Sequence, residues 1–219
     1  DALPILVEYM VSNSLLEHLL NYTNIEKEVL ENLIFYSKVE NIGFNEKLDI
    51  LKSLNSIKIL DPACGSGAFP MGILNKIVEI LNLIDIDAKE WLKLQSKEFQ
   101  NKHQNKDPDY IRKLSIIQNS IYGVDIQPIA IEIAKLRFFL SLLVDEDKNR
   151  IEPLPNLEFK FVCANTLLPL EKIEFPNGQA DLFSGENLEA KYKTILKELK
   201  EIKKEYFFAS LNKGEIKKK

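Results

Sequence analysis

Apolar residues recur at intervals of three or four positions through the first quarter of the chain. That period is typical of amphipathic helices, so the pattern predicts helices between residues 5 and 54. The polar, glycine-containing stretch at 41–43 interrupts the period and predicts a break between helices. The positions that carry the period are Ile5, Leu6, Tyr9, Met10, Leu15, Leu16, Leu19 and Leu20, then Val29, Leu30, Leu33, Ile34 and Tyr36.

The middle of the chain alternates short strand-like runs with longer helical ones. The helix predicted at 69–83 is apolar on almost every side and should therefore be buried. Another helix is predicted to begin at 126–128 and to run to Val144, since a proline is well placed in a first helical turn. Short apolar or alternating runs predict three strands, at 57–60, 120–124 and 158–163.

Residues 84–119 differ in composition from the segments on either side. They are rich in Lys, Gln, Asn and Glu, and they predict helices at 87–105 and 109–118 that are more solvated than their neighbours. Trp91 is expected to anchor these helices to the body of the protein. A further helix, rich in Lys and Glu, is expected at roughly 187–206.

The order of these elements predicts an α/β fold. Strand, glycine turn, helix, strand, helix and strand form a βαβαβ pattern, which implies a partial doubly wound parallel sheet with right-handed crossovers. Ligands bind such sheets at the carboxyl ends of the strands. The expected parts are an N-terminal helical segment at 1–56, an α/β core at 57–170 with a helical insertion at 84–119, and a Lys-rich tail at 171–219.

The first predicted strand ends in the sequence DPACGSGAF at 61–69. Gly65 and Gly67 allow a tight turn and let a ligand approach the main chain closely. The helix N-terminus that follows suits a carboxylate or phosphate, whereas Asp61 suits an ammonium group. A ligand with both an amino and a carboxylate group fits this pairing better than a pyrophosphate does.

Two nucleotide-binding motifs can be excluded at this turn. The dinucleotide fingerprint requires a glycine where the chain has Pro70. The P-loop requires Lys-Ser/Thr where the chain has Ile73-Leu74. The glycine turn therefore belongs to neither class.

Asp125 ends the second predicted strand, where a carboxylate can accept two hydrogen bonds from a ribose diol. It lies 64 positions after Asp61, whereas about 20 positions usually separate a glycine turn from such an acid. An insertion at 84–119 accounts for the difference. Ile126 can face an adenine ring, and Asn165 at the end of the third strand offers an amide to the adenine edge.

Composition indicates an ordinary globular protein rather than a polycation. The 219 residues carry 29 Lys and Arg against 33 Asp and Glu, a net charge of −4. Only three of the basic residues are Arg, the usual side chain for bidentate contacts to guanine, so little base reading is expected within this chain. The two Cys form no disulfide framework, and no apolar run approaches the length of a membrane span. A reducing cytoplasm is the expected compartment.

Some isolated residues have a structural interpretation. Cys64 is expected to be a small buried residue rather than a nucleophile, His18 a packing residue and His103 a solvated one. Glu158-x-Lys160 matches a nuclease pattern that is common by chance. Neither the histidines nor the cysteines have metal-ligand spacing, so no metal site is predicted.

Several stretches carry a family resemblance when taken together. They read ILDPACGSGAFPMG at 59–72, IYGVDIQPIA at 121–130, AKLRFF at 134–139, PLPNL at 153–157 and VCANTL at 162–167, with EYFFA at 205–209. In this order they resemble the S-adenosylmethionine-dependent DNA adenine-N6 methyltransferases of the combined restriction–modification (type IIG-like) family. The ordered matches over about 59–168 are more specific than a single glycine motif would be.

The resemblance implies a Rossmann-like methyltransferase core with S-adenosyl-L-methionine as cofactor. The loop at 61–67 would hold the methionine moiety, and Phe69 would cover it. Asp125 would bind the ribose, Ile126 would pack on the adenine and Asn165 would contact its amino edge. The cofactor-binding residues implied are Asp61, Pro62, Ala63, Gly65, Gly67, Phe69, Asp125, Ile126 and Asn165, with the helix around Tyr9-Met10 nearby.

The family's catalytic loop is absent from the sequence. Enzymes that methylate adenine flip the base and hold it with an Asn/Asp-Pro-Pro-Tyr/Phe loop. The nearest string, Asp107-Pro108-Asp109-Tyr110, lacks the second proline and precedes the second strand, so no catalytic residue is assigned. We therefore expect a fragment that binds the cofactor weakly and does not methylate DNA by itself. A nuclease upstream of Asp1 and a DNA-recognition domain beyond Lys219 would complete the protein.

Two other functions stay open on the sequence alone. The same kind of target loop can hold a glutamine amide, so a methyltransferase acting on protein or RNA is one alternative. A non-catalytic Rossmann-like module that contacts protein or DNA is the other. Titration with S-adenosylmethionine separates the module from the enzymes. The sequence indicates neither the DNA recognition site nor the oligomeric state.

Overall fold

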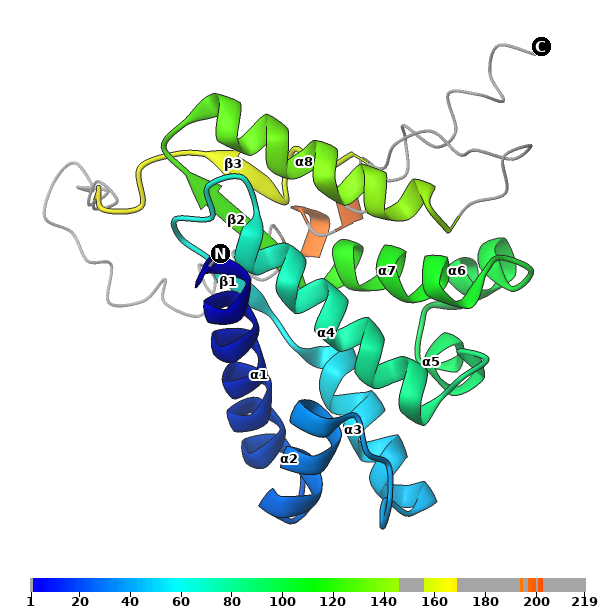
Figure 1. The fold of residues 1–219 in the computed structure, drawn as a ribbon. Helices are drawn as coiled ribbons and strands as arrows, with labels where there is room; N and C mark the ends of the chain where they lie inside the picture. The colour runs from blue at the N-terminus through cyan, green and yellow to red at the C-terminus, as the bar shows by residue number, and fades with distance from the viewer. Residues whose placement is uncertain (1, 146–155, 169–193, 195–196, 200, 203–219) are drawn as a thin grey trace, which may run out of the picture.

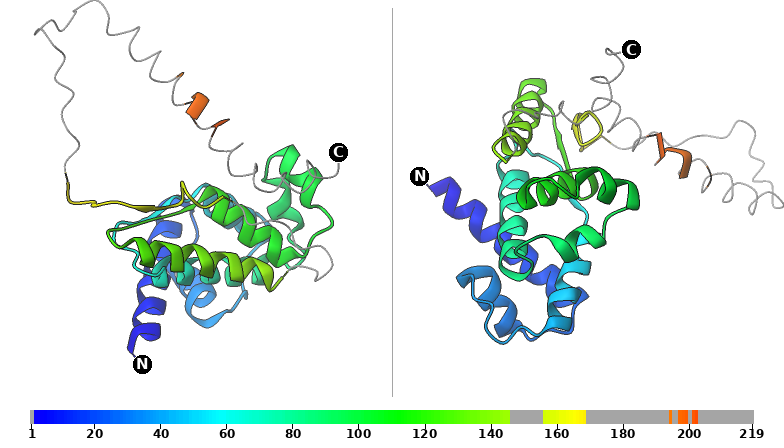
Figure 2. Two further views of the ribbon diagram at one scale, coloured as in Figure 1. Left: turned by 90° about the horizontal axis from the view of Figure 1, so that it is seen from above. Right: turned by 90° about the vertical axis from the view of Figure 1, so that its right-hand side faces the viewer.

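The computed structural model describes residues 2–145 and 156–168, with residues 194, 197–199 and 201–202. Figure 1 shows helices packed around a small sheet. Figure 2 shows the same arrangement from above and from the side. In chain order the elements are α1 (Ala2–Tyr22), α2 (Lys27–Tyr36), α3 (Phe44–Ser56), β1 (Ile59–Asp61), α4 (Ala68–Ile84), α5 (Lys89–Lys93), α6 (Lys97–His103), α7 (Pro108–Asn119), β2 (Ile121–Asp125), α8 (Pro128–Leu143) and β3 (Phe161–Cys163).

The first three helices confirm the prediction for residues 5–54. Helix α1 packs against α2 and α4, and its side chains Leu15 and Leu19 are buried at the contact. Ser37 ends α2 in the left-handed conformation, with φ of 54°. The break predicted at 41–43 falls just before α3, where the Gly43 amide donates to the Glu46 carboxylate at 2.6 Å and so closes the first turn.

The three strands form one parallel sheet in the order β1-β2-β3, as the βαβαβ pattern predicts. Gly123 of the central strand lies opposite Asp61 on one side and Phe161 on the other. Asp125 is in register with Cys163. The carboxyl ends of the three strands therefore meet at one edge, which is where the site residues were expected.

The third strand is shorter than the predicted 158–163. Residues 158–160 form a turn, in which Glu158 accepts a hydrogen bond from Lys135 of α8 at 2.8 Å. The Lys160 ammonium lies 3.9 Å from the centre of the Tyr122 ring. These contacts, and not strand pairing, explain the alternating pattern there. The first strand begins at Ile59 rather than at 57 because α3 extends to Ser56 and leaves 57–58 as a connection.

One face of the sheet packs against helices. Ile121, Gly123 and Phe161 point to that face, and the Phe161 ring lies 4.7 Å from the Phe138 ring of α8. On the opposite face Leu60 and Val162 are 63% and 41% exposed. The core therefore lies between the sheet and the helices, and α1 extends it across α4.

The segment 84–119 forms three helices instead of the two predicted. Ser96 interrupts the helix expected at 87–105, because its hydroxyl accepts a hydrogen bond from the Phe99 amide at 3.3 Å and caps a new helix. The Trp91 indole is buried and donates to the Ser115 hydroxyl of α7 at 2.8 Å, so it joins two helices of the insertion, and its anchoring to the rest of the protein stays a prediction.

The expectation that this insertion is solvated is wrong for its second half. His103 is completely buried, with its ring 4.5 Å from that of Phe99 and 6.2 Å from that of Tyr110. Most of α7 is buried too, because it packs against α4 and α8. The polar composition of this segment did not predict its burial, because apolar residues at helical spacing form one buried face of α7.

Two further predictions concern the helix at 187–206 and membrane-spanning segments. Most of the predicted helix at 187–206 lies outside the described residues, although 194, 197–199 and 201–202 are helical. Within the part of the chain that the structure describes, no helix has both the length and the apolar character needed to cross a membrane.

Arg112 joins the insertion to the end of α4. Its side chain is 1% exposed and pairs with Asp109 at 2.6 Å. The guanidinium also donates to the carbonyls of Asp85 and Ile86 and to the Asn82 side chain. Asp85 is the C-cap residue of α4 and Ile86 follows it, so this one side chain supplies donors to the backbone carbonyls just beyond the helix.

Replacing Arg112 by Met should lower the free energy of unfolding by about 2–4 kcal/mol, because buried acceptors lose their donor. Urea unfolding followed by circular dichroism measures the change. Arg137→Met is the matched control, since Arg137 is exposed and forms no ion pair with any residue that the structure describes. We expect the control to change stability by less than about 0.5 kcal/mol. Equal losses in the two variants would contradict this role for Arg112.

Candidate functional site

The loop between β1 and α4 turns sharply at two glycines. Gly65 and Gly67 have φ of 52° and 84°, in the left-handed region that other residues rarely adopt. A Cβ on Gly67 would lie 3.1 Å from the Ala134 Cβ, so this glycine allows α8 to pack closely. A Cβ on Gly65 would meet nothing within 4 Å. Open space for a ligand is therefore found beside Gly65, and the space beside Gly67 is filled by the protein.

The Asp125 carboxylate holds this loop against the end of β2. One oxygen, Oδ2, accepts a hydrogen bond from the Gly65 amide at 2.8 Å, and Oδ1 accepts one from the Gln127 amide at 2.9 Å. The bonds from Gln127 and Gly65 lower the pKa of Asp125, so the group is ionised at neutral pH. A carboxylate has about four acceptor positions. The backbone amides do not take all of them, so the carboxylate can also accept a hydrogen bond from a ligand.

Asp61 ends β1 with half of its carboxylate unsatisfied. Its Oδ1 accepts a hydrogen bond from the Ala63 amide at 3.1 Å. Its Oδ2 is buried and has no hydrogen-bond partner among the described residues. A buried acceptor without a donor is costly, and an ammonium group of a bound ligand would satisfy it. The residues present therefore fit a ligand that brings an amino group.

A groove of about 530 Å³ runs beside β1, between α1 and α4. Its lining includes four of the predicted site residues, Asp61, Pro62, Ala63 and Phe69. The other five predicted residues, Gly65, Gly67, Asp125, Ile126 and Asn165, lie outside that lining. They continue the site across the carboxyl edge of the sheet, where the Gly65–Asp125 hydrogen bond joins the loop after β1 to the end of β2.

Helix α1 forms the far wall of this groove. Met10 lines it, as expected for the helix around Tyr9-Met10, whereas Tyr9 is 65% exposed and takes no part in the lining. His18 also lines it and stacks on Tyr22, with 4.6 Å between ring centres, while its Nε2 lies 3.1 Å from the Ser53 hydroxyl. Burial lowers the pKa of His18. This confirms that His18 is a packing residue.

The chain turns tightly after β3. The Ala164 amide donates to the Asp125 carbonyl at 3.0 Å, and the Leu167 amide donates to the Asn165 side-chain oxygen at 3.0 Å. The amide nitrogen of Asn165 is left as a donor. Ile126, beside the Asp125 carboxylate, is 65% exposed. An apolar surface, a carboxylate and an amide donor are thus neighbours at this end of the sheet.

Comparison with known proteins identifies the family. A family described as "MmeI, DNA-methyltransferase domain" matches residues 38–208, which is more than half of the chain. The chain belongs to this family. A protein of Methanocaldococcus jannaschii, described as a type II restriction enzyme and methyltransferase, is 37% identical over 122 residues, or 54% of the chain. The match spans only 9% of that protein's length. No solved structure matches the chain.

Membership in the MmeI methyltransferase family confirms the resemblance drawn from the sequence and makes this chain part of a DNA methyltransferase domain. The relative combines restriction and methylation, as the type IIG-like pattern predicted. The family match favours DNA over the protein or RNA substrates that the sequence left open. A DNA methyltransferase domain implies S-adenosylmethionine as methyl donor.

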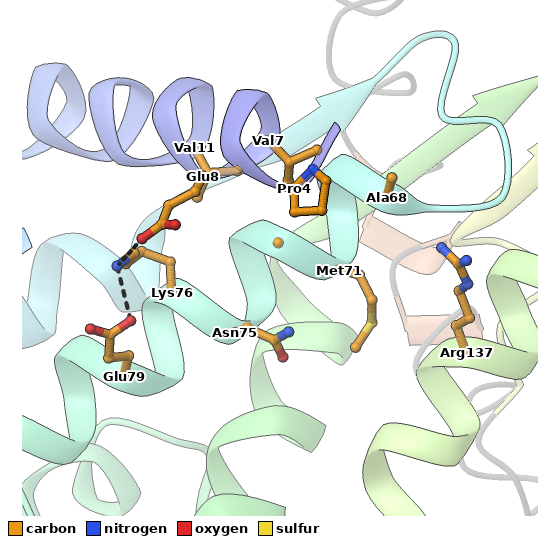
Figure 3. Close-up of a pocket in the computed structure, with 11 residues that line it drawn as sticks. Pro4, Val7, Glu8, Val11, Ala68, Met71, Asn75, Lys76, Glu79 and Arg137 are labelled. Atoms are coloured by element: carbon orange, nitrogen blue, oxygen red, sulfur yellow. Dashed lines mark ion pairs between the residues drawn. The ribbon is translucent and has the colours of Figure 1, made fainter. Parts of the chain in front are cut away.

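A second hollow, of about 410 Å³, lies between the N-terminal turns of α1 and helix α4 (Figure 3). None of the predicted site residues lines it. Lys76, 10% exposed, pairs there with Glu79 at 2.9 Å and lies 3.9 Å from Glu8 of α1. The helix predicted to be almost wholly apolar therefore buries a lysine, which links α4 to α1.

The remaining candidates of the sequence have structural roles. Asp107 caps α7, since its Oδ1 accepts a hydrogen bond from the Asp109 amide at 2.8 Å, and Tyr110 is buried. The string at 107–110 is therefore a helix start. Among the described residues no group of three or more His, Cys, Asp or Glu is arranged to hold a metal ion.

Sequence reasoning missed two residues at the site. Cys163 is exposed beside Asp125, and its thiol donates to the Ile126 carbonyl at 3.5 Å. Thr166 donates to the Pro62 carbonyl at 3.1 Å. Both lie in the matched stretch at 162–167, and the predicted carboxyl end of β3 was the signal that could have drawn attention to them.

The two thiols should react very differently with iodoacetamide. Cys64 is buried, and burial together with the charges of Asp61 and Asp125 raises its pKa to about 11, so little thiolate forms at pH 8. Cys163 is exposed and should be alkylated first. Peptide mass spectrometry of the folded chain measures both, and a urea-unfolded sample is the control in which both react. Equal rates in the folded chain would contradict this arrangement.

Proposed function

We propose that this chain binds S-adenosylmethionine as the cofactor-binding part of a site-specific DNA adenine-N6 methyltransferase, within a combined restriction–modification enzyme. The observation that carries the proposal is the pair of carboxylates around the Gly65 turn. Asp61 has a buried oxygen without a donor, and Asp125 has acceptor positions beyond those taken by the Gly65 and Gln127 amides. Both can accept hydrogen bonds from a ligand that brings donors.

S-adenosylmethionine offers matching groups at both positions. Its ammonium would lie at Asp61, and its carboxylate would lie near the N-terminus of α4, where the helix dipole is positive. The ribose hydroxyls would donate to Asp125, and the adenine would pack on Ile126 with its polar edge toward the Asn165 amide. Pro62, Ala63, Gly65 and Gly67 would shape the turn, and Phe69 would cover the methionine end. When bound, the cofactor supplies a methyl group on a sulfonium.

We propose that methyl transfer also needs parts of a larger protein. The Asn/Asp-Pro-Pro-Tyr/Phe loop that holds a flipped adenine is absent from residues 1–219. Only 9% of the relative's length is matched, which leaves room for such a loop, for a DNA-recognition part and for a nuclease. The DNA contacts of the whole enzyme would come from these parts. Both thiols are free, which suits a reducing cytoplasm.

Calorimetric titration of the 219-residue chain with S-adenosylmethionine tests the binding proposal. We expect binding weaker than submicromolar for the chain, and at least about tenfold weaker still for Asp125→Asn, which keeps the size of the side chain but loses charge and an acceptor. Asp49→Asn, an exposed carboxylate on α3, is the matched control and should bind as the original chain does.

No heat from the original chain, or equal affinity of Asp125→Asn, would contradict the proposal and favour a non-catalytic module. If Asp125→Asn fails to fold, alkylation of Cys163 decides the matter without a variant. A cofactor that lies over Asp125 and Ile126 should slow that reaction, whereas S-adenosylmethionine should leave it unchanged if it binds elsewhere or not at all.

The 219-residue chain should not transfer a methyl group to DNA. The physical reason is that nothing in the chain supplies the loop that orients the adenine amine. Incubation with duplex DNA and S-adenosylmethionine carrying a tritiated methyl group, followed by capture of the DNA, measures transfer. The intact enzyme is the positive control. Labelled N6-methyladenine formed by the chain alone would contradict the proposal that methyl transfer needs further parts of a larger protein.

A further inference from the structure

A hydrogen bond crosses the carboxyl edge of the sheet from β3 to β1. The Thr166 hydroxyl, three residues beyond β3, donates to the Pro62 carbonyl at 3.1 Å. Strands β1 and β3 are not neighbours, since each pairs with β2 between them. The bond therefore passes across the end of β2, where the Asp125 carboxylate lies.

The turn that carries Thr166 is held at two points. On one side the Ala164 amide donates to the Asp125 carbonyl at 3.0 Å. Within the turn, the amides of Leu167 and Leu168 donate to the side chain and carbonyl of Asn165, at 3.0 and 3.3 Å. The Thr166 hydroxyl supplies the second anchor, on the loop after β1. Asn165 lies between the two anchors.

We propose that Thr166 is a positioning residue for cofactor binding. Its hydroxyl fixes the turn at 164–168 relative to the glycine loop, so that the Asn165 amide stays aligned with the adenine edge while the methionine end occupies the loop beside Pro62. This inference rests on the proposed function. The bond joins the part of the site that would hold the base to the part that would hold the amino acid, and it brings the two to a fixed separation before the cofactor arrives.

Two substitutions separate the hydroxyl from the rest of the side chain. Thr166→Val keeps the branched shape and removes the donor, and it should weaken binding of S-adenosylmethionine by about three- to tenfold, the usual worth of one neutral hydrogen bond. Thr166→Ser keeps the donor and should restore binding to within about twofold of the original. The affinity of Thr166→Val for adenosine alone should fall by a similar factor, because the adenine of adenosine would contact Asn165 in the same way.

Thr23→Val is the matched control. The Thr23 hydroxyl also donates to a backbone carbonyl, that of Leu19 at 2.7 Å, but at the carboxyl end of α1. It should leave cofactor affinity unchanged. Thr166 is exposed, so the melting temperature of Thr166→Val without cofactor should also match the original. A change in affinity without a change in melting temperature is what a positioning role predicts.

Calorimetric titration of all four proteins gives distinguishable outcomes. Unchanged or tighter binding by Thr166→Val overturns the inference and leaves the proposed function standing. Weak binding by Thr166→Ser as well, or an equal loss in Thr23→Val, also overturns it, since the effect then does not belong to this hydroxyl. Absence of binding by the original chain overturns the proposed function itself, and the inference with it.

Discussion

The Asp125 carboxylate connects the elements on which the candidate site depends. It accepts the Gly65 amide from the loop after β1 and the Gln127 amide at the start of α8. The Cys64 amide adds a bond to the Val124 carbonyl at 2.9 Å, so the glycine loop is bound to the end of β2 at two successive residues. Since the two amides lower the pKa of Asp125, its charge and these bonds persist at neutral pH. The loop's left-handed glycines are thereby held in one conformation.

Placing Asp125 there requires β2 to lie beside β1 despite the long insertion between them. The Trp91–Ser115 hydrogen bond holds the insertion together, and Arg112 together with the packing of α7 on α4 and α8 joins the insertion to the core. The insertion thus packs as part of the core and returns the chain to the sheet. One of the three arginines is used for this purpose, which further limits the bidentate base contacts that the chain could make to DNA.

The sequence predicted what local pattern and chain order determine. The parallel sheet, and the edge where the candidate residues meet, were predicted by the helical periods, the glycine turn and the acid at the end of β2. The family match agrees with the resemblance drawn from the sequence. Local pattern could not predict contacts between side chains that are far apart in the sequence. Glu158 and Lys160 alternate like a strand but serve contacts to Lys135 and Tyr122, and Lys76 is buried because Glu8 and Glu79 neutralise it. The Thr166 bond joins residues 104 positions apart, which no periodicity could reveal.

The distribution of charge around the glycine loop bears on which ligand it can accept. A pyrophosphate at this loop would gain from the α4 N-terminus but would face Asp125 and the unsatisfied oxygen of Asp61. A ligand with an ammonium, a carboxylate and ribose hydroxyls meets each of these groups with the opposite partner. The physical chemistry of the loop therefore supports an amino-acid-bearing nucleoside over a dinucleotide, independently of the family to which the chain belongs.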